Sequence, residues 1–405
     1  MTQVLLKGGH VVPGDGSAER PETDVLVDGG VITALAPGLT GAPGTTVIDA
    51  AGMIVMPGLV DSHRHVWQAP LRGAGADMTL PDYLATVLGP ILTGYTPHDA
   101  GLATLLGAAE ALDAGITTVF DWSNTTTTET HTDAVRDAYA AAGIRAVVGL
   151  VHPDHEAYAR RVQRGPATVT AGFAVAGMEY GDHDDTVRSV RLARDMGVTV
   201  SMHAAGPAVR ALYDAGLLGP HVNLVHLNAI TADDAKMLAD TAAGVTVTPV
   251  VEATMGHGTS AYGRLRDAGA RPGVGTDVVV NAPADLFEPM RDTLRTERLR
   301  TGTMLPAAAI LPAATLDSAR AIGLDQLVGT IEVGKRADLV LLNGLPSPSA
   351  AAAVTNATPA DVHTVIVDGR LVKRDGRLVD LDLAALRHAG RTLAHRVLRE
   401  ASMVA

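Results

Sequence analysis

The hydrophobic positions of this chain follow one pattern at its two ends and another in its middle. Near the N-terminus, short apolar runs such as VLLKGGHVV and DVLVDGGVITALA are separated by Gly, Asp and Pro. The same pattern returns near the C-terminus in GTIEVGKRADLVLLNG and VHTVIVDGRLVKRDGRLV. Short apolar runs bounded by turn residues indicate β-strands. We therefore expect one small, discontinuous β-domain built from residues 1–56 and 328–380.

The middle of the chain alternates apolar strands with helical segments. Runs such as GITTVFDW, IRAVVGLVH and VTVSMHAAG are separated by stretches such as DDTVRSVRLARDMG. This alternation is typical of repeated βα units and a parallel sheet. With LVDSHRH as the first, eight strands fall between about residue 58 and residue 280, the number that a (β/α)8 barrel needs. An open doubly wound sheet is the alternative, but no G-x-G-x-x-G follows the first strand. We predict an α/β fold with a TIM barrel over residues 57–327.

Two further segments lie outside these units. Residues 381–405 contain LAALRHAGRTLAHRVLRE, whose apolar spacing predicts an amphipathic C-terminal helix that packs on the barrel or on a partner subunit. Residues 350–353 are all alanine, and we interpret them as a surface connection.

Composition narrows the class of protein. The 405 residues are 47% hydrophobic and 19% charged, which is typical of a globular protein. The formal net charge of −12 argues against a nucleic-acid or anionic-membrane surface. The absence of Cys excludes thiolate metal sites and a Cys nucleophile, and no G-x-S-x-G supports a Ser hydrolase. Because neither a signal peptide nor a long apolar run is seen, we expect a cytoplasmic protein.

Candidate metal ligands follow the predicted strands. His63 and His65 end an apolar strand in MPGLVDSHRHVW, and residues two apart on a strand point the same way. His203, His226 and Asp277 each close a further strand, so all five meet at the C-terminal mouth of a barrel. Singly, each fits an ordinary role as a hydrogen-bonded His or a capping Asp. Together they favour a site for a divalent ion, Zn²⁺ or alternatively Fe²⁺.

The chemistry of such a site is hydrolytic. A divalent ion of this kind lowers the pKa of bound water to ~7. Asp277 can accept the proton of this water and pass it to the leaving group. His226 can donate a hydrogen bond to the water or to a developing oxyanion. These residues predict attack of water on an sp² carbon.

Several motifs together resemble the amidohydrolase superfamily: PGLVDSHRH after a β-rich N-terminus, a single His after strands five and six, the GTD of strand eight, and the closing VGTIEVGKRADLVLL. The resemblance covers nearly the whole chain and is strongest to the branch of cytosine deaminases and triazine hydrolases. It implies a distorted barrel with a small β-sandwich from both chain ends. It further implies one metal, zinc or sometimes iron, on His63, His65, His203 and Asp277, with His226 catalytic beside it, and a homo-oligomer of two or more copies.

Two departures refine this expectation. Other branches bridge two metals with a carboxylated Lys, but no Lys stands between Lys7 and Lys236, so a single metal is implied unless Glu179 bridges a second. The branch usually carries H-x-x-E after strand five, where this chain has Gly206 in place of the Glu. That Glu is the acid that protonates a ring nitrogen of the substrate.

The resulting hypothesis is a mononuclear metal-dependent amidohydrolase that cleaves a non-peptide C–N bond in a small cyclic or heterocyclic substrate, by deamination first of all. Because of Gly206, ring opening of a cyclic amide or imine, or loss of another leaving group, is the alternative. A second alternative is a barrel that binds a metal or a ligand without catalysis.

Candidate substrate-binding residues follow several strands. Asp121, Glu179, Glu252 and His257 stand at predicted mouth loops and are candidates to replace the missing Glu. The three acidic residues, Asp121, Glu179 and Glu252, also fit roles as helix caps, loop residues or partners of Arg. His257 also fits an exposed position.

Trp67, Gln68 and Arg72 follow the first two His residues in HVWQAPLRG and are candidates for a pocket wall. Trp offers a stacking face and Gln an amide that can pair with a planar ring. Ordinary loop packing is the alternative for each.

Overall fold

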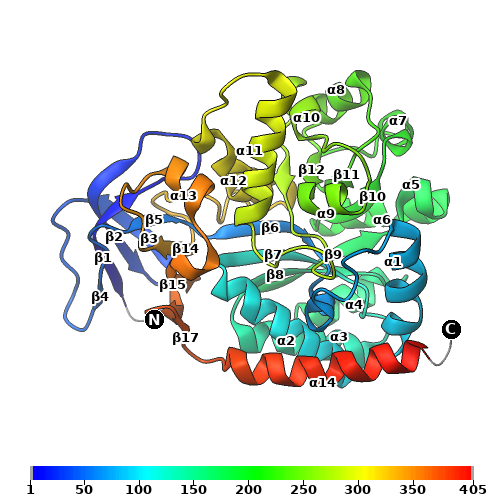
Figure 1. Ribbon diagram of the computed structural model, residues 1–405, viewed down its shortest axis with the longest axis horizontal. Helices are drawn as coiled ribbons and strands as arrows, with labels where there is room; N and C mark the ends of the chain where they lie inside the picture. The colour runs from blue at the N-terminus through cyan, green and yellow to red at the C-terminus, as the bar shows by residue number, and fades with distance from the viewer. Residues whose placement is uncertain (1–2, 403–405) are drawn as a thin grey trace.

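Both ends of the chain share one β-sheet, called here the end sheet. The computed structural model describes residues 3–402. Strand β5 (Ile54–Pro57) pairs antiparallel with β14 (Leu339–Leu342), which joins the two ends (Figure 1). The strands follow the order β17-β16-β15-β14-β5-β1-β2-β3, with β4 beside β1. The other strands are β1 (Val4–Val11), β2 (Arg20–Asp28), β3 (Val31–Ala36), β4 (Thr46–Asp49), β15 (Val362–Val367), β16 (Arg370–Arg374) and β17 (Arg377–Leu378).

The second sheet, called here the barrel sheet, has eight parallel strands in the simple order β6 to β13. They are β6 (Leu59–Arg64), β7 (Ile116–Ser123), β8 (Arg145–Leu150), β9 (Val169–Val175), β10 (Val200–Ala204), β11 (Val222–His226), β12 (Gly244–Val247) and β13 (Gly273–Val274). A parallel bridge between Arg64 and Asp277 brings the last strand beside the first. The sheet is therefore a nearly closed barrel, and the predicted fold class and eight strands are confirmed.

Helices follow the barrel strands and cover them. They are α2 (Pro97–Asp113), α3 (Glu129–Ala142), α4 (His155–Val162), α6 (His183–Met196), α7 (Pro207–Asp214), α8 (Ala232–Asp240), α10 (Tyr262–Asp267), α11 (Phe287–Thr301) and α12 (Leu316–Ala321). Their ends have local causes. Thr96 and Asp99 form a capping box that begins α2, and Gly143 ends α3 in the left-handed conformation.

Shorter helices lie in the loops between these elements. They are η1 (Val66–Leu71), α1 (Leu80–Thr86), η2 (Val87–Ile91), α5 (Gly177–Tyr180), α9 (Pro249–Thr254), η3 (Ala307–Ala314), α13 (Ala350–Asn356) and η4 (Pro359–Asp361). The interpretation of residues 350–353 as a surface connection is wrong, because they begin α13. Ser349 caps this helix, Ala350 and Ala353 are buried, and alanine has the best helix propensity.

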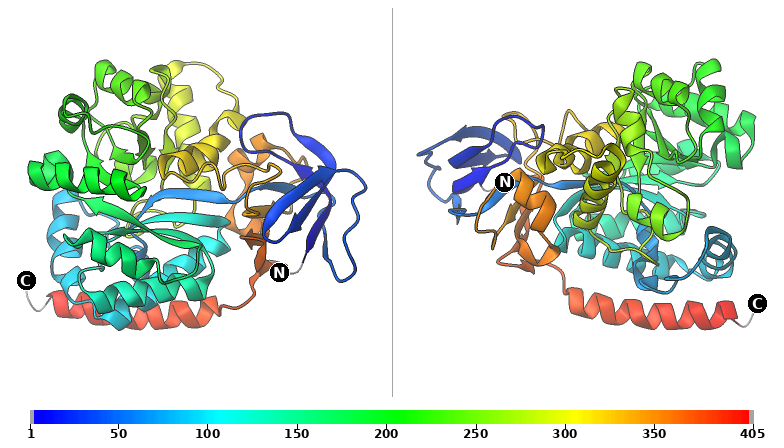
Figure 2. Two further views of the ribbon diagram at one scale, coloured as in Figure 1. Left: turned by 180° about the vertical axis from the view of Figure 1, so that it is seen from behind. Right: turned by 45° about the horizontal axis from the view of Figure 1, so that its top comes forward.

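The predicted C-terminal helix is present as α14 (Leu383–Ser402). It lies along the side of the barrel against α2, η1 and η2 (Figure 2). Leu393, Ala394 and Val397 are buried in this contact, as the amphipathic pattern requires. Among residues 3–402, no helix combines the length and the apolar character that crossing a bilayer needs.

Candidate metal centre and active site

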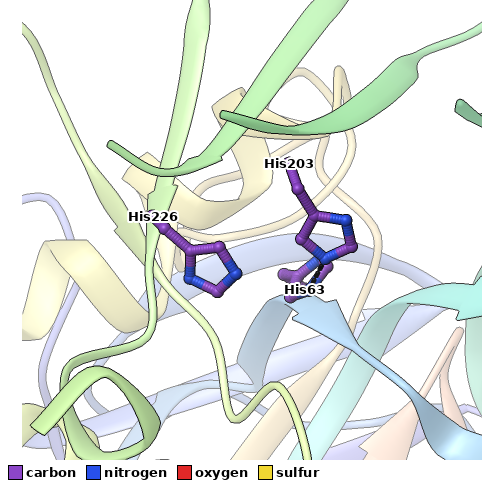
Figure 3. A group of neighbouring side chains, drawn as sticks. All are labelled: His63, His203 and His226. Atoms are coloured by element: carbon purple, nitrogen blue, oxygen red, sulfur yellow. Dashed lines mark hydrogen bonds between the residues drawn. The ribbon is translucent and has the colours of Figure 1, made fainter. Parts of the chain in front are cut away.

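Side chains from four strand ends of the barrel sheet converge on one point. His63 lies in β6, His65 directly follows it, His203 lies in β10, His226 ends β11 and Asp277 follows β13. Figure 3 shows the rings of His63, His203 and His226 gathered around a shared space. The Nε2 atoms of His63 and His203 are 3.3 Å apart. Asp277 Oδ1 lies 3.3 Å from His63 Nε2 and 3.4 Å from His65 Nε2.

These separations fit one metal ion. Ligand atoms placed about 2.0–2.1 Å from an ion at the corners of a tetrahedron are about 3.3–3.4 Å apart. Three imidazole nitrogens and one carboxylate oxygen are the donor set that borderline divalent ions prefer. His63, His65 and Asp277 form one candidate metal-binding group whose ligand atoms lie within 4.8 Å of one another, and His63, His203 and His226 form a second group that shares His63.

The ionisation states of these residues suit ligation. Burial, and then the charge of His63, lowers the pKa of His65 to about 4. Burial and the neighbouring imidazoles hold the pKa of His203 well below its ordinary value. Burial alone would raise the pKa of Asp277, but its hydrogen bond with His63 and the charges of the surrounding imidazoles lower it. A neutral imidazole on His65 and on His203 and an ionised carboxylate on Asp277 are the forms that bind a metal.

Neighbouring groups orient His65 and Asp277. Nδ1 of His65 donates a hydrogen bond to Asn124 Oδ1 at 2.7 Å, so its Nε2 faces the shared space. The Trp67 indole donates to the same oxygen at 2.9 Å. The backbone N–H of Asp277 donates to the carbonyl of His63 at 2.9 Å. Asn124 was missed in the sequence, although it directly follows β7 and so satisfied the strand-end criterion.

The buried carboxylate of Glu252 lies beside Nδ1 of His226. This nitrogen lies 3.0 Å from Thr248 Oγ1 and 3.5 Å from Glu252 Oε1, and Glu252 is fully buried. Burial alone would lower the pKa of His226, but the hydrogen bond with Glu252 and the charges of Asp277 and Glu252 raise it. Both His226 and Asp277 have positive φ, at 77° and 58°. Such conformations in non-glycine residues store strain and cluster at functional sites.

A cavity of about 560 Å³ opens beside these residues. Its polar lining includes His65, His203, His226 and Asp277. The ring of Trp122 also lines it and lies 4.0 Å, between centroids, from that of His203. Its apolar lining includes Leu80, Leu84, Leu88, Met255 and Val278. Within residues 3–402, Asp277 is the one carboxylate that lines this cavity, and neither Lys nor Arg does so.

Of the candidate substrate residues, His257 lines the cavity and the pocket-wall candidates do not. Trp67 is fully buried and packs edge-on against Tyr95. Gln68 is also buried and donates to the hydroxyl of Tyr83, which itself lines the cavity, at 2.6 Å. Arg72 forms an ion pair with Glu110 of α2 at 3.0 Å.

The three candidate carboxylates also lie outside the cavity wall. Asp121 is fully buried and accepts a hydrogen bond from the backbone N–H of Val66, and burial raises its pKa to about 6. Glu252 lies beneath His226 and accepts from the backbone N–H of Thr248 at 2.8 Å. Glu179 of α5 accepts hydrogen bonds at the N-terminus of α7.

The contacts of Glu179 explain how the chain accommodates Gly206. Its carboxylate accepts from the N–H groups of Ala205, Gly206 and Ala208 at 2.6, 2.9 and 2.8 Å. A Cβ on Gly206 would lie 2.9 Å from the carbonyl oxygen of Ala229, so a side chain there requires backbone movement. A carboxylate from α5 thus caps a helix whose own N-cap residue has no side chain.

Comparison with protein families and curated proteins gives consistent matches. A model of the amidohydrolase family matches residues 54–372. A 5-methylthioadenosine/S-adenosylhomocysteine deaminase of Symbiobacterium thermophilum is 31% identical over 99% of this chain and 100% of its own length. A 5'-deoxyadenosine deaminase of Methanosarcina mazei is 27% identical over 94% of this chain and 95% of its own length.

Solved structures show the same fold. An adenosine deaminase of Xanthomonas campestris with bound zinc superimposes with a TM-score of 0.89, at 24% identity over 98% of both chains. The atrazine chlorohydrolase of Arthrobacter aurescens complexed with zinc gives a TM-score of 0.86, at 21% identity over 96% of this chain and 100% of its own.

Proposed function

The chain belongs to the amidohydrolase family, and from this premise we propose that it hydrolyses the C–N bond of an amino group on a heterocycle and releases ammonia. The observation that carries the proposal is the convergence of three histidines and Asp277 beside an open cavity. The names of the deaminase relatives support deamination over ring opening.

His63, His65, His203 and Asp277 would hold one divalent metal, which supplies Lewis acidity and lowers the pKa of water at the site. We propose zinc rather than iron, with support from the zinc in two structural neighbours. Asp277 accepts the first proton of the attacking water on its carboxylate. His226, held at Nδ1 by Thr248 and Glu252, turns the opposite edge of its ring toward the oxygen that gains charge.

The proton balance of the reaction assigns Asp277 a second task. Water supplies an oxygen to the ring carbon and two protons to nitrogen. One proton reaches the ring nitrogen beside that carbon, and the other converts the departing amino group into ammonia. Since Asp277 is the one carboxylate lining the cavity within residues 3–402, it carries these protons from oxygen to nitrogen.

The cavity supports an adenine nucleoside with an apolar group, or none, at its 5' position as the substrate. Its volume of about 560 Å³ suits a small molecule. Leu80, Leu84 and Leu88 offer an apolar surface within the same cavity as the metal ligands. One relative is named for both 5-methylthioadenosine and S-adenosylhomocysteine, and another is named for 5'-deoxyadenosine. A charged amino-acid substituent finds no Lys or Arg on the cavity wall of residues 3–402.

The test is a mass-spectrometric assay of the zinc-loaded protein. The substrates are 5'-deoxyadenosine, 5'-methylthioadenosine and S-adenosylhomocysteine, with a cyclic amide and a cyclic imine beside them. We expect release of ammonia from the first two and much slower reaction of the third. A chelator abolishes the reaction and zinc restores it. Water addition without ammonia, on the cyclic substrates alone, would instead establish the ring-opening alternative.

Asp277→Asn is the matched control for this assay. Because the amide cannot accept the proton of water, turnover falls by about 10²–10⁴-fold. Zinc content, measured by atomic absorption, separates lost proton transfer from lost metal. Full activity of this variant with bound zinc would contradict the assigned role of Asp277.

A further inference from the structure

The loop after α9 is built to present His257. The backbone N–H of His257 donates to the carbonyl of Glu252 at 2.8 Å, which turns the chain back over the end of the helix. Gly256 and Gly258 flank it with φ of 72° and 101°, conformations that glycine adopts readily. The turn places the His257 ring in the cavity wall, edge-on to His226 with 6.0 Å between centroids.

One polar atom of His257 has no partner within the molecule. Its Nε2 is shielded from solvent and has no hydrogen-bond partner among residues 3–402. Native structures leave few buried polar atoms unpaired, because each one costs free energy. Two further polar groups of the cavity wall already accept hydrogen bonds, Asn124 Oδ1 from His65 and Trp67 and the Tyr83 hydroxyl from Gln68, and the Tyr83 O–H keeps its own proton to donate. His257 therefore has a hydrogen bond to offer to a ligand.

The reaction needs such a donor. Attack of water on the carbon of an aminated ring moves an electron pair onto the adjacent ring nitrogen, and a donor aimed at that nitrogen stabilises the developing charge. The three other carboxylates considered as candidates, on Asp121, Glu179 and Glu252, all lie outside the cavity wall and accept backbone hydrogen bonds. Asp277 accepts and returns the protons of water, so the donor must be a different group.

We infer that the Nε2–H of His257 donates a hydrogen bond to the ring nitrogen beside the carbon that loses its amino group. This inference rests on the proposed deamination and adds a substrate-contacting residue to it. The tautomer required carries its proton on Nε2 and leaves Nδ1 unprotonated. The hydrogen bond strengthens as charge develops on nitrogen, and Asp277 delivers the proton that finally stays there.

The test is a binding cycle that needs no turnover. Zinc-loaded Asp277→Asn protein is titrated with 5'-deoxyadenosine and with its 1-deaza analogue, in which CH replaces the ring nitrogen. With His257 present, we expect the analogue to bind about 5- to 100-fold more weakly. With His257→Leu added, the two ligands should bind within about twofold of each other. His257→Gln keeps an N–H donor and should retain part of the difference.

Kinetics in the otherwise unaltered enzyme give a second readout. His257→Leu should lower kcat for 5'-deoxyadenosine by about 10²–10³-fold, as removal of a transition-state donor does. KM should rise by up to about 5- to 100-fold, because the same hydrogen bond contributes to substrate binding, while zinc content and the thermal midpoint should change little. His395→Leu, at an exposed position of α14, is the matched control and should leave all four quantities unchanged.

The outcomes separate this inference from the function on which it rests. One outcome would overturn the role of His257 and leave the proposed deamination standing. In it, the enzyme releases ammonia, and the preference for 5'-deoxyadenosine over its 1-deaza analogue is the same with and without His257→Leu. If neither adenine ligand binds and no ammonia appears, the proposed substrate and this inference fail together. His257 would have a structural role instead if His257→Leu lowered the zinc content or the thermal midpoint and His257→Gln did not fully restore either quantity.

Discussion

At the scale of single residues, the convergence of the strand-end histidines followed from the sequence, and the burial of Trp67 and Gln68 did not. His63, His203 and His226 lie in predicted strands, and the barrel topology alone carries their side chains to one mouth. Trp67 and Gln68 are different, because η1 begins at Val66 and turns both side chains into the interior. The path of a loop depends on contacts that local patterns do not encode.

Gly206 provides a test of how the chain dispenses with a side chain at the N-cap of α7. Gly206→Ala places a Cβ 2.9 Å from the carbonyl oxygen of Ala229, and the nearest atoms are all backbone. We expect a loss of about 1–3 kcal/mol in the free energy of unfolding, measured by denaturant titration. Gly206→Glu should be no more active than Gly206→Ala, because the N-terminus of α7 already binds the Glu179 carboxylate.

Gly101→Ala is the matched control for Gly206→Ala. It lies inside α2, and its added Cβ would meet its nearest neighbours at 3.4 Å, an ordinary contact. Because glycine is a poor helix former, this change should be neutral or stabilising. Higher deaminase activity of Gly206→Glu than of the natural chain would show that the close approach of the Ala229 carbonyl does not prevent a side chain at position 206.

At the scale of elements, the strands were more predictable than the helices at the barrel mouth. Strands such as β7 and β8 are buried along their whole length and are rich in apolar residues, which local patterns detect. The short helices α1 and η2 come from LPDYLATVLGPI, whose two prolines and mixed polarity give no clear period. They supply much of the apolar cavity wall, so the shape of the substrate site was the least predictable part of the fold.

The contact between α2 and α14 predicts a pH-dependent contribution to stability. Asp99 accepts from Thr96 in the capping box of α2 and from Arg396 of α14 at 2.6 Å. Burial alone would raise the pKa of Asp99, but these hydrogen bonds and the charge of Arg396 lower it below 3.8. A carboxyl group whose pKa is lowered on folding stabilises the fold above its unfolded value and loses this contribution as pH falls through the folded value.

Asp99→Asn should therefore destabilise the protein by about 1–2 kcal/mol at pH 7. The difference from the natural chain, followed by urea unfolding at a series of pH values, should stay constant down to about pH 5 and shrink below 3.8. Asp382→Asn tests whether the effect is specific, since Asp382 caps only the start of α14 from an exposed position. A difference that grows as pH falls would contradict the assigned direction of the pKa shift.

At the scale of the whole molecule, a buried cluster of ion pairs fastens the end sheet to the barrel sheet. Arg145 at the start of β8 donates from Nε and Nη2 to the two carboxylate oxygens of Asp338, each at 2.9 Å. Asp368 accepts from the same guanidinium and from Arg336. The partners are 193 and 223 residues apart in the chain, so local patterns could predict both sheets but not the charges that join them.

Asp338→Asn tests how far the two sheets depend on this cluster. Asp338 and Arg145 are almost fully buried, and loss of one partner leaves a guanidinium in a low-dielectric environment with only Asp368 beside it. We expect a loss of about 3 kcal/mol in the free energy of unfolding.

Glu156→Gln, which breaks an exposed pair with Arg160, should cost at most about 0.5 kcal/mol. If Arg145→Met is combined with Asp338→Asn, much of the loss should be recovered, because the penalty comes from the uncompensated charge and not from the missing contact. Equal effects of the buried and exposed substitutions would show that the sheets hold together through apolar packing alone.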